Sequence, residues 1–138
     1  MSVGDMVAAG DLEIVETDAD AAQASLVEAR QHIESARLIA GSDPNGAYQL
    51  AYDAARKAVM SSMRASGVRV RKGDGGHMIA AAYASVAVEE SLGKRLDFAR
   101  RRRNRSEYGS AFFDDEAIAA IIDLAAALIE AVSDQLSA

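Results

Sequence analysis

Apolar residues recur every three or four positions along five stretches of this 138-residue chain. This spacing aligns them on one face of a helix, whereas no stretch shows the sustained alternation that is typical of a half-buried strand. Half of the residues are apolar, but only 5% are aromatic and a single one is proline. Because alanine is abundant as well, the sequence predicts an all-α protein, an up-and-down bundle of about five helices that pack closely through small side chains.

Glycine, proline and aspartate residues divide the chain into these helices. Gly41 suits a helix end, and Asp43 followed by Pro44 suits the cap and first position of the next helix. The stretch "SGVRVRKGDGG" holds four of the ten glycines and is the main break. The expected helices cover residues 18–40, 44–65, 77–90, a fourth that begins after Leu92-Gly93 and ends near 108, and 114–136. Residues 1–17 are acidic and aperiodic, so we expect a flexible arm ahead of one domain that spans 18–138.

The composition excludes several kinds of protein. Without cysteine, the chain has neither disulfides nor a thiolate metal site, and its two histidines are too few for a metal site without carboxylates. We therefore expect no metal and no cofactor. No apolar run approaches the roughly 20 residues that span a bilayer, and the N-terminus lacks the basic start and apolar core of a signal peptide. The sequence predicts a soluble, cytoplasmic protein that does not enter a membrane.

Positive charge is concentrated in one segment of an otherwise acidic chain. The formal net charge is -6, yet residues 94–105 hold seven basic residues against one acidic residue, a net +6, which leaves -12 on the other 126 residues. This layout argues against a protein covered in positive charge for general nucleic-acid binding, and it suits one anionic ligand or strand held at one place. The alternative is a solvated basic helix that pairs with acidic patches of this chain or of a partner subunit.

The helical period singles out one arginine of this segment. Leu92, Leu96 and Ala99 form the apolar stripe, and the next position at the same spacing is Arg103, which lies within roughly 20° of Leu92 around the helix axis. Because a buried, unpaired guanidinium is costly, Arg103 is expected either to have a partner or to line a cleft. Glu107, one turn further on, is the natural partner within the helix.

Three stretches together resemble a known family. "AYDAARKAVMSSMRASGVRV" lies in the second expected helix, "GGHMIAAAYASV" opens the third, and "RNRSEY" stands just before the last helix. In this order they resemble the HEPN superfamily, the higher-eukaryote and prokaryote nucleotide-binding domains, over most of residues 20–136. The hallmark of that family is an arginine, usually a polar residue, three or more further residues and a histidine. Here it reads Arg103-Asn104-x-x-x-Tyr108, with a tyrosine where the histidine stands in the family.

The resemblance implies a HEPN-like homodimer. In catalytic members, the arginine and histidine of two subunits meet in a cleft at the dimer interface and cut RNA without a metal. The catalytic pair of this chain would be Arg103 and Tyr108, but a tyrosine with an ordinary pKa near 10 is a poor general base at pH 7. On an ideal helix the two side chains would also point roughly 140° apart. We therefore expect a degenerate ribonuclease motif.

Three functions remain open at this stage. The first, which we favour, is a homodimer whose arginine-lined cleft binds RNA or a nucleotide without efficient cleavage. The second is an active, metal-independent endoribonuclease, the toxin of a toxin–antitoxin pair, restrained by a nucleotidyltransferase partner for which Tyr108 is a modification target. The third is a helical scaffold for protein–protein contact without a ligand.

The expected RNA- or nucleotide-binding residues are Arg100, Arg101, Arg102, Arg103, Asn104 and Arg105. The helical period predicts that three of them, Arg101, Arg102 and Arg105, face solvent. Glu107 and His77 are expected to support the structure, with His77 capping or packing the third helix.

Overall fold

The computed structural model describes residues 1–73, 75–108 and 113–138, with side chains for all of these except 106–108. Its elements in chain order are α1 (Val3–Ala8), β1 (Leu12–Ile14), α2 (Ala19–Ile39), α3 (Pro44–Ser66), β2 (Val68–Val70), α4 (Gly76–Ala87), α5 (Glu90–Tyr108) and α6 (Asp115–Ser137). The protein is therefore mostly helical, which confirms the all-α prediction. Among the described residues, the strands β1 and β2 form only a small antiparallel pair.

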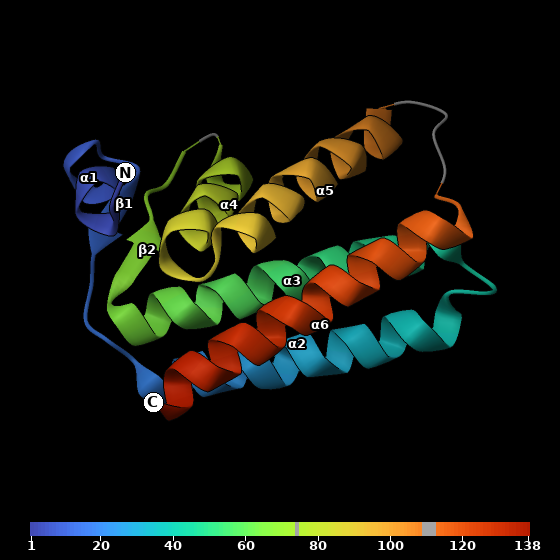
Figure 1. The fold of residues 1–138 in the computed structure, drawn as a ribbon, viewed down its shortest axis with the longest axis horizontal. Helices are drawn as coiled ribbons and strands as arrows, with labels where there is room; N and C mark the ends of the chain where they lie inside the picture. The colour runs from blue at the N-terminus through green and yellow to red at the C-terminus, as the bar shows by residue number, and fades with distance from the viewer. Residues whose placement is uncertain (74, 109–112) are drawn as a thin grey trace.

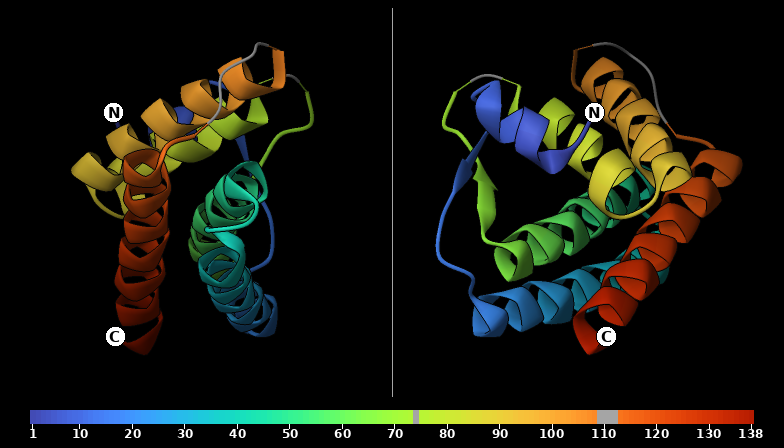
Figure 2. Two further views of the ribbon diagram at one scale, coloured as in Figure 1. Left: turned by 90° about the vertical axis from the view of Figure 1, so that its right-hand side faces the viewer. Right: turned by 60° about the vertical axis from the view of Figure 1, so that its left-hand side comes forward.

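Helix α3 is the centre of the fold. It packs along α2 and α6 and also contacts α4 and α5. Figure 1 shows α2, α3 and α6 running beside one another, and Figure 2 shows α4 and α5 lying side by side as a second layer over them. Five alanines of α3 are completely buried, so small side chains set the close approach of the helices: Ala47, Ala51, Ala54, Ala55 and Ala58. No helix in the described part of the chain is long and apolar enough to cross a membrane.

Aspartate caps explain where the long helices begin, and of these the cap at Asp43 was predicted. Asp18, Asp43 and Asp114 each accept a hydrogen bond from a backbone N–H of the following first turn. Pro44 stands at the first position of α3, and Gly67 ends that helix in the left-handed conformation, at φ 78°. All five predicted helices are present, and three of them, α2, α3 and α6, begin and end within one residue of their expected bounds.

The break between the third and fourth expected helices was placed too late. The chain turns at Val88 and Glu89, so Leu92 and Gly93 lie inside α5 rather than ahead of it. Gly93 is the point at which α5 approaches Ser85 of α4. The glycine therefore permits close packing of two helices rather than the end of one.

Residues 1–17 contain α1 and β1, where we expected a flexible arm. The side chains of Met6 and Leu12 are buried, and Ser2 and Asp5 form a reciprocal capping box at the start of α1. A helix of six residues and a strand of three are too short to give a sustained period, which is why the sequence did not indicate them. This segment packs on the domain through its two buried side chains.

Candidate functional site

Arg103 lies on the inner side of α5 and faces α3. Its side chain is half-buried, its Nε donates to Oε1 of Gln49 at 2.9 Å, and its guanidinium carbon lies 5.3 Å from the centre of the Tyr52 ring. The helical period that picked this arginine as inward-facing was therefore correct. A hydrogen bond on one side and an aromatic face beneath hold the guanidinium in a defined position.

Tyr48 fixes the part of α5 that carries Arg103. Its hydroxyl donates to the carbonyl of Ala99 at 3.0 Å, one helical turn before Arg103, and its ring stacks on Phe113 with a centroid distance of 3.7 Å. Burial raises the pKa of Tyr48 to about 12, so this hydroxyl keeps its proton and remains a donor. The contact joins α3 to α5 directly next to the candidate site.

His77, from α4, lies beside Tyr52. The Tyr52 hydroxyl and Nδ1 of His77 are 2.8 Å apart, and the two rings are nearly parallel, with an interplanar angle of 8°. Arg103 from α5, Tyr52 from α3 and His77 from α4 therefore stand in series. We call these three side chains the Arg103 cluster. The expectation for His77 was only structural support, and the structure brings it into the same cluster as the inward arginine.

Burial keeps both rings of the cluster neutral, and the neighbouring positive charges add to this effect only at His77. Burial raises the pKa of Tyr52 above its ordinary value, against the opposing effect of Arg103. Burial also lowers the pKa of His77 below its ordinary 6.5, and the nearby positive charges of Arg56, Arg103 and Arg100 lower it further. His77 is therefore uncharged at pH 7, and an anion placed among these arginines would favour its protonation.

Two further arginines border the cluster, each joined to one aspartate. Arg56 binds Oδ1 of Asp53 through Nη2 at 2.8 Å, and Arg100 binds Oδ1 of Asp97 through Nη2 at 2.9 Å. Although burial opposes ionisation of Asp53, hydrogen bonds from Arg56 and Lys57 hold the pKa of its carboxyl below the usual range. The Nε of Arg56 is buried and has no hydrogen-bond partner among the described residues.

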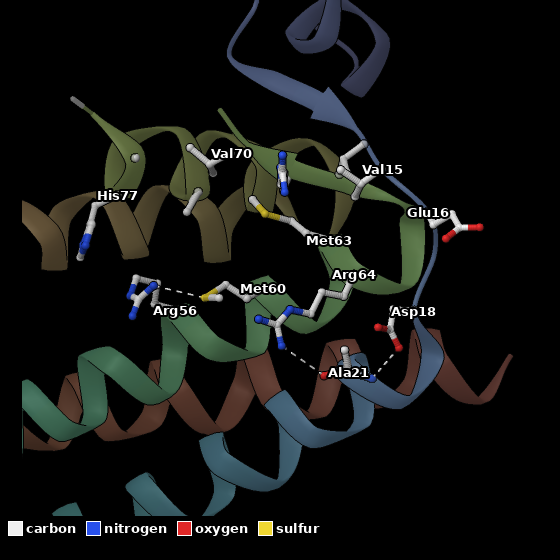
Figure 3. Close-up of a pocket in the computed structure, with 14 residues that line it drawn as sticks. Val15, Glu16, Asp18, Ala21, Arg56, Met60, Met63, Arg64, Val70 and His77 are labelled. Carbon is white, nitrogen blue, oxygen red and sulfur yellow. Dashed lines mark hydrogen bonds between the residues drawn. The ribbon is translucent and has the colours of Figure 1, made fainter. Parts of the chain in front are cut away.

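A groove of about 660 Å³ extends from Arg56 and His77 along α3. Figure 3 shows these two side chains at one end of the groove, the sulfur-bearing Met60 and Met63 further along, and Arg64 toward the other end. The volume falls within the range of pockets that hold small organic ligands. The groove therefore offers an apolar surface next to a cluster of positive charge.

The other residues of the arginine run point in different directions. Arg101 and Arg105 are exposed, as predicted, whereas Arg102 is half-buried, with its guanidinium 5.6 Å from the centre of the Phe113 ring. The prediction that Arg102 faces solvent was thus wrong, because the ring of Phe113, which follows α5 in the chain, lies against its guanidinium. Asn104 is half-buried. The run does not form one surface: Arg103 belongs to the cluster, Arg100 borders it, and the others lie outside it.

The second half of the family motif lies outside the described side chains. The backbone of α5 is helical through Tyr108, and Glu107 lies within it, but their side chains are not among those described. The expected pairing of Arg103 with Glu107 and the expected catalytic role of Tyr108 therefore stay predictions.

Sequence reasoning missed Tyr52 and Arg56 as members of the site. Tyr52 was assigned to the core stripe of its helix, and it is indeed 2% exposed. The available signal was the spacing of Gln49, Tyr52 and Arg56, which are three and then four residues apart. This spacing aligns their polar groups along one face of a helix whose other inward positions are apolar. The partner of that column, His77, lies 25 residues from Tyr52 and no local pattern connects them.

Comparison of the chain with protein-family models, with curated proteins and with solved structures finds no match. Within the described residues, no group of three or more histidine, aspartate or glutamate side chains is arranged to hold a metal ion.

Proposed function

We propose that this protein binds RNA or a nucleotide through a phosphate group held at the Arg103 cluster. The observation that carries the proposal is a half-buried arginine, braced by Gln49 and stacked over Tyr52, in series with a neutral histidine. A guanidinium presents several N–H donors in a rigid plane, which matches the oxygens of a phosphate. Bracing holds these donors in place before the ligand arrives, so little conformational entropy is lost on binding.

The surroundings of the cluster fit a phosphate ester better than a free ion. Arg56 and His77 both line the groove, so they stand at the junction between the cluster and the groove. A phosphate at the junction would leave the attached nucleoside in a groove of about 660 Å³ that is lined by Met60 and Met63. The resemblance to the HEPN superfamily agrees with this class of ligand.

A direct binding experiment tests the proposal. Purified protein is titrated against a fluorescein-labelled single-stranded RNA by anisotropy, and against a nucleoside monophosphate and inorganic phosphate by calorimetry. We expect RNA affinity to fall steeply between 50 and 200 mM salt, as counterion release requires. We also expect the nucleoside monophosphate to bind more tightly than inorganic phosphate, because only the former fills the groove. Absence of binding to all three would reject the proposal and leave the scaffold as the remaining function.

RNA affinity is expected to rise as the pH falls from about 8 to 6. The folded chain holds a proton on His77 only weakly, because burial and the arginines lower its pKa. A bound phosphodiester keeps its negative charge throughout this range and raises the pKa of His77, so binding takes up a proton and is favoured at lower pH. Anisotropy titrations across this range measure the effect.

Replacing His77 by glutamine should flatten this pH dependence. His32 supplies the matched control, since it is the other histidine of the chain and lies against Lys57 and Asp53 rather than in the cluster. The His32→Gln variant should keep the pH dependence of the wild type. Equal pH profiles for the wild type and His77→Gln would show that protonation of His77 is not coupled to RNA binding.

Cleavage of the bound RNA is a second candidate function, favoured by one observation. A neutral imidazole beside an arginine is the combination that proton transfer at a phosphodiester needs. We expect the wild type to bind RNA without forming product in a single-turnover assay, and Tyr108→His to gain cleavage by restoring the family's histidine. Product from the wild type that disappears in Arg103→Ala would instead establish an active ribonuclease.

The proposed partners follow from the resemblance. A homodimer should sediment at twice the mass of the 14.5-kDa chain. The described members of the Arg103 cluster come from a single chain, so phosphate binding there needs no second subunit. A nucleotidyltransferase partner would leave a nucleotidyl group on Tyr108, which intact-mass spectrometry after co-expression detects.

A further inference from the structure

Helix α5 carries a second basic surface on its outer side. At about 100° per residue, six of its side chains fall within an arc of about 120° that lies outside the stripe of the buried Leu92, Leu96 and Ala99 and adjoins it on the side of Arg95. We call this surface the outer face of α5. It consists of Lys94, Arg95, Phe98, Arg101, Arg102 and Arg105. Five positive charges therefore surround one aromatic ring.

Phe98 is the apolar residue at the centre of the outer face, and its ring is exposed. Its exposed fraction is 55%, and it is the one exposed aromatic residue among the side chains that the structure describes. It borders a shallow groove of about 250 Å³ between α5 and α6, together with Arg95 and Arg102. The Phe98 ring is therefore accessible to a ligand at the edge of this groove, next to the positive charges of Arg95 and Arg102.

The charge of the outer face selects the kind of ligand. Arg95 and Arg105 have no ion pair with a carboxylate in the described part of the chain, whereas Lys94 pairs with Glu90 and Arg101 with Asp97. Ion pairs between exposed side chains are weak, so a polyanion can displace these two. An isologous contact with a second copy would set two such faces against each other and is opposed by repulsion.

We propose that the outer face of α5 binds single-stranded RNA, with one base stacked on Phe98 and the flanking phosphates on Arg95 and Arg102. The inference rests on the proposed function, in that it takes RNA as the ligand, and it adds a second contact outside the Arg103 cluster. A single strand is required because only an unstacked base can lie on an aromatic side chain, and such stacking accepts any base. The arginines on the inner and outer sides of α5 then contact different parts of one RNA.

The absence of tryptophan in this chain provides a direct test. Phe98→Trp places a sole indole fluorophore at the proposed stacking position. Titration with a ten-nucleotide oligoadenylate should quench its fluorescence saturably, with the same midpoint as anisotropy, and a duplex RNA of equal length should not. Phe98→Ala should weaken binding of the single strand about tenfold, within the range that removal of a stacking aromatic gives.

Leu38→Ala is the control, because Leu38 is 85% exposed on α2 and far from the basic segment in sequence. This variant should bind RNA like the wild type. Unchanged RNA affinity in Phe98→Ala would overturn the inference. So would loss of self-association in that variant without loss of RNA binding, since the face would then join two copies of the chain.

Calorimetry with a nucleoside monophosphate separates this inference from the proposed function. A monophosphate bound at the Arg103 cluster does not reach Phe98 on the opposite side of the helix, so Phe98→Ala should leave its affinity unchanged. If the protein binds the monophosphate and Phe98→Ala keeps its RNA affinity, the proposal for the outer face is wrong and the proposed function stands. If Phe98→Ala loses RNA binding and the protein does not bind the monophosphate, the proposal for the outer face is supported. Phosphate binding at the Arg103 cluster is then rejected.

Discussion

Gly93→Ala is expected to lower the free energy of unfolding by about 2 kcal/mol. A Cβ at this position would lie 2.0 Å from Oγ, 2.3 Å from the backbone N and 2.5 Å from Cα of Ser85. Rotation of the serine side chain relieves only the first of these contacts, so α4 and α5 must move apart. Overpacking of this kind costs about 1–3 kcal/mol. Helix propensity alone predicts the opposite sign, since alanine in a helix interior is better than glycine by roughly 0.5–1 kcal/mol.

Chemical denaturation followed by circular dichroism measures this loss. Gly41→Ala is the matched control, because a Cβ at Gly41 meets no atom within 4 Å and its φ is not positive. We expect the control to change the free energy of unfolding by less than about 0.5 kcal/mol, as a surface substitution away from special features does. A Gly93→Ala protein more stable than the wild type would mean that α4 and α5 do not cross at this distance.

The long helices were predictable because their signals are local. In α2 the apolar residues Ala22, Leu26, Ala29 and Ile33 repeat at helical spacing, and Asp18 supplies the cap directly before them. Each of these signals lies within one or two turns of the residue that it describes. Period and cap therefore located the helix without knowledge of its neighbours.

The packing between helices was not predictable from such signals. Gly93 indicated a break because glycine disfavours helices, whereas the structure uses its missing side chain to bring α5 against α4. Helix α4 is apolar almost all round, so its period does not define one inner face: Val86 is exposed, while Ala80 and Ala84 are buried. Both features depend on which neighbour a helix meets, and that is set by residues distant in sequence.

The candidate site was half predictable for the same reason. Arg103 was found because it interrupts an apolar stripe on its own helix. Tyr52 and His77 could not be joined to it, because they belong to α3 and α4, and only the crossing of three helices brings them together. Phe98 attracted no notice, since an exposed phenylalanine and a buried one look the same in a sequence.

Arg103→Ala is expected to weaken binding of a nucleoside monophosphate by about 10- to 100-fold. Hydrogen bonds to a charged partner contribute about 1.5–3 kcal/mol, and this arginine is held in place by Gln49 and Tyr52 before the ligand binds. For RNA, the slope of log K against log salt should also fall by about 1, because one phosphate contact is lost. Arg103→Lys should keep that slope and still lose affinity, since an ammonium lacks the planar fork of the guanidinium.

Arg37→Ala is the matched control for the loss of charge. Arg37 is a half-exposed arginine near the end of α2, paired with Glu34, and it has no contact with the cluster among the described residues. Both alanine variants remove one positive charge from a chain of net charge -6. An equal loss of affinity in the two variants would mean that ligand binding depends only on the net charge of the protein and not on the position of Arg103. A loss confined to Arg103→Ala, in a variant with unchanged melting temperature, can come only from the position of that guanidinium above Tyr52.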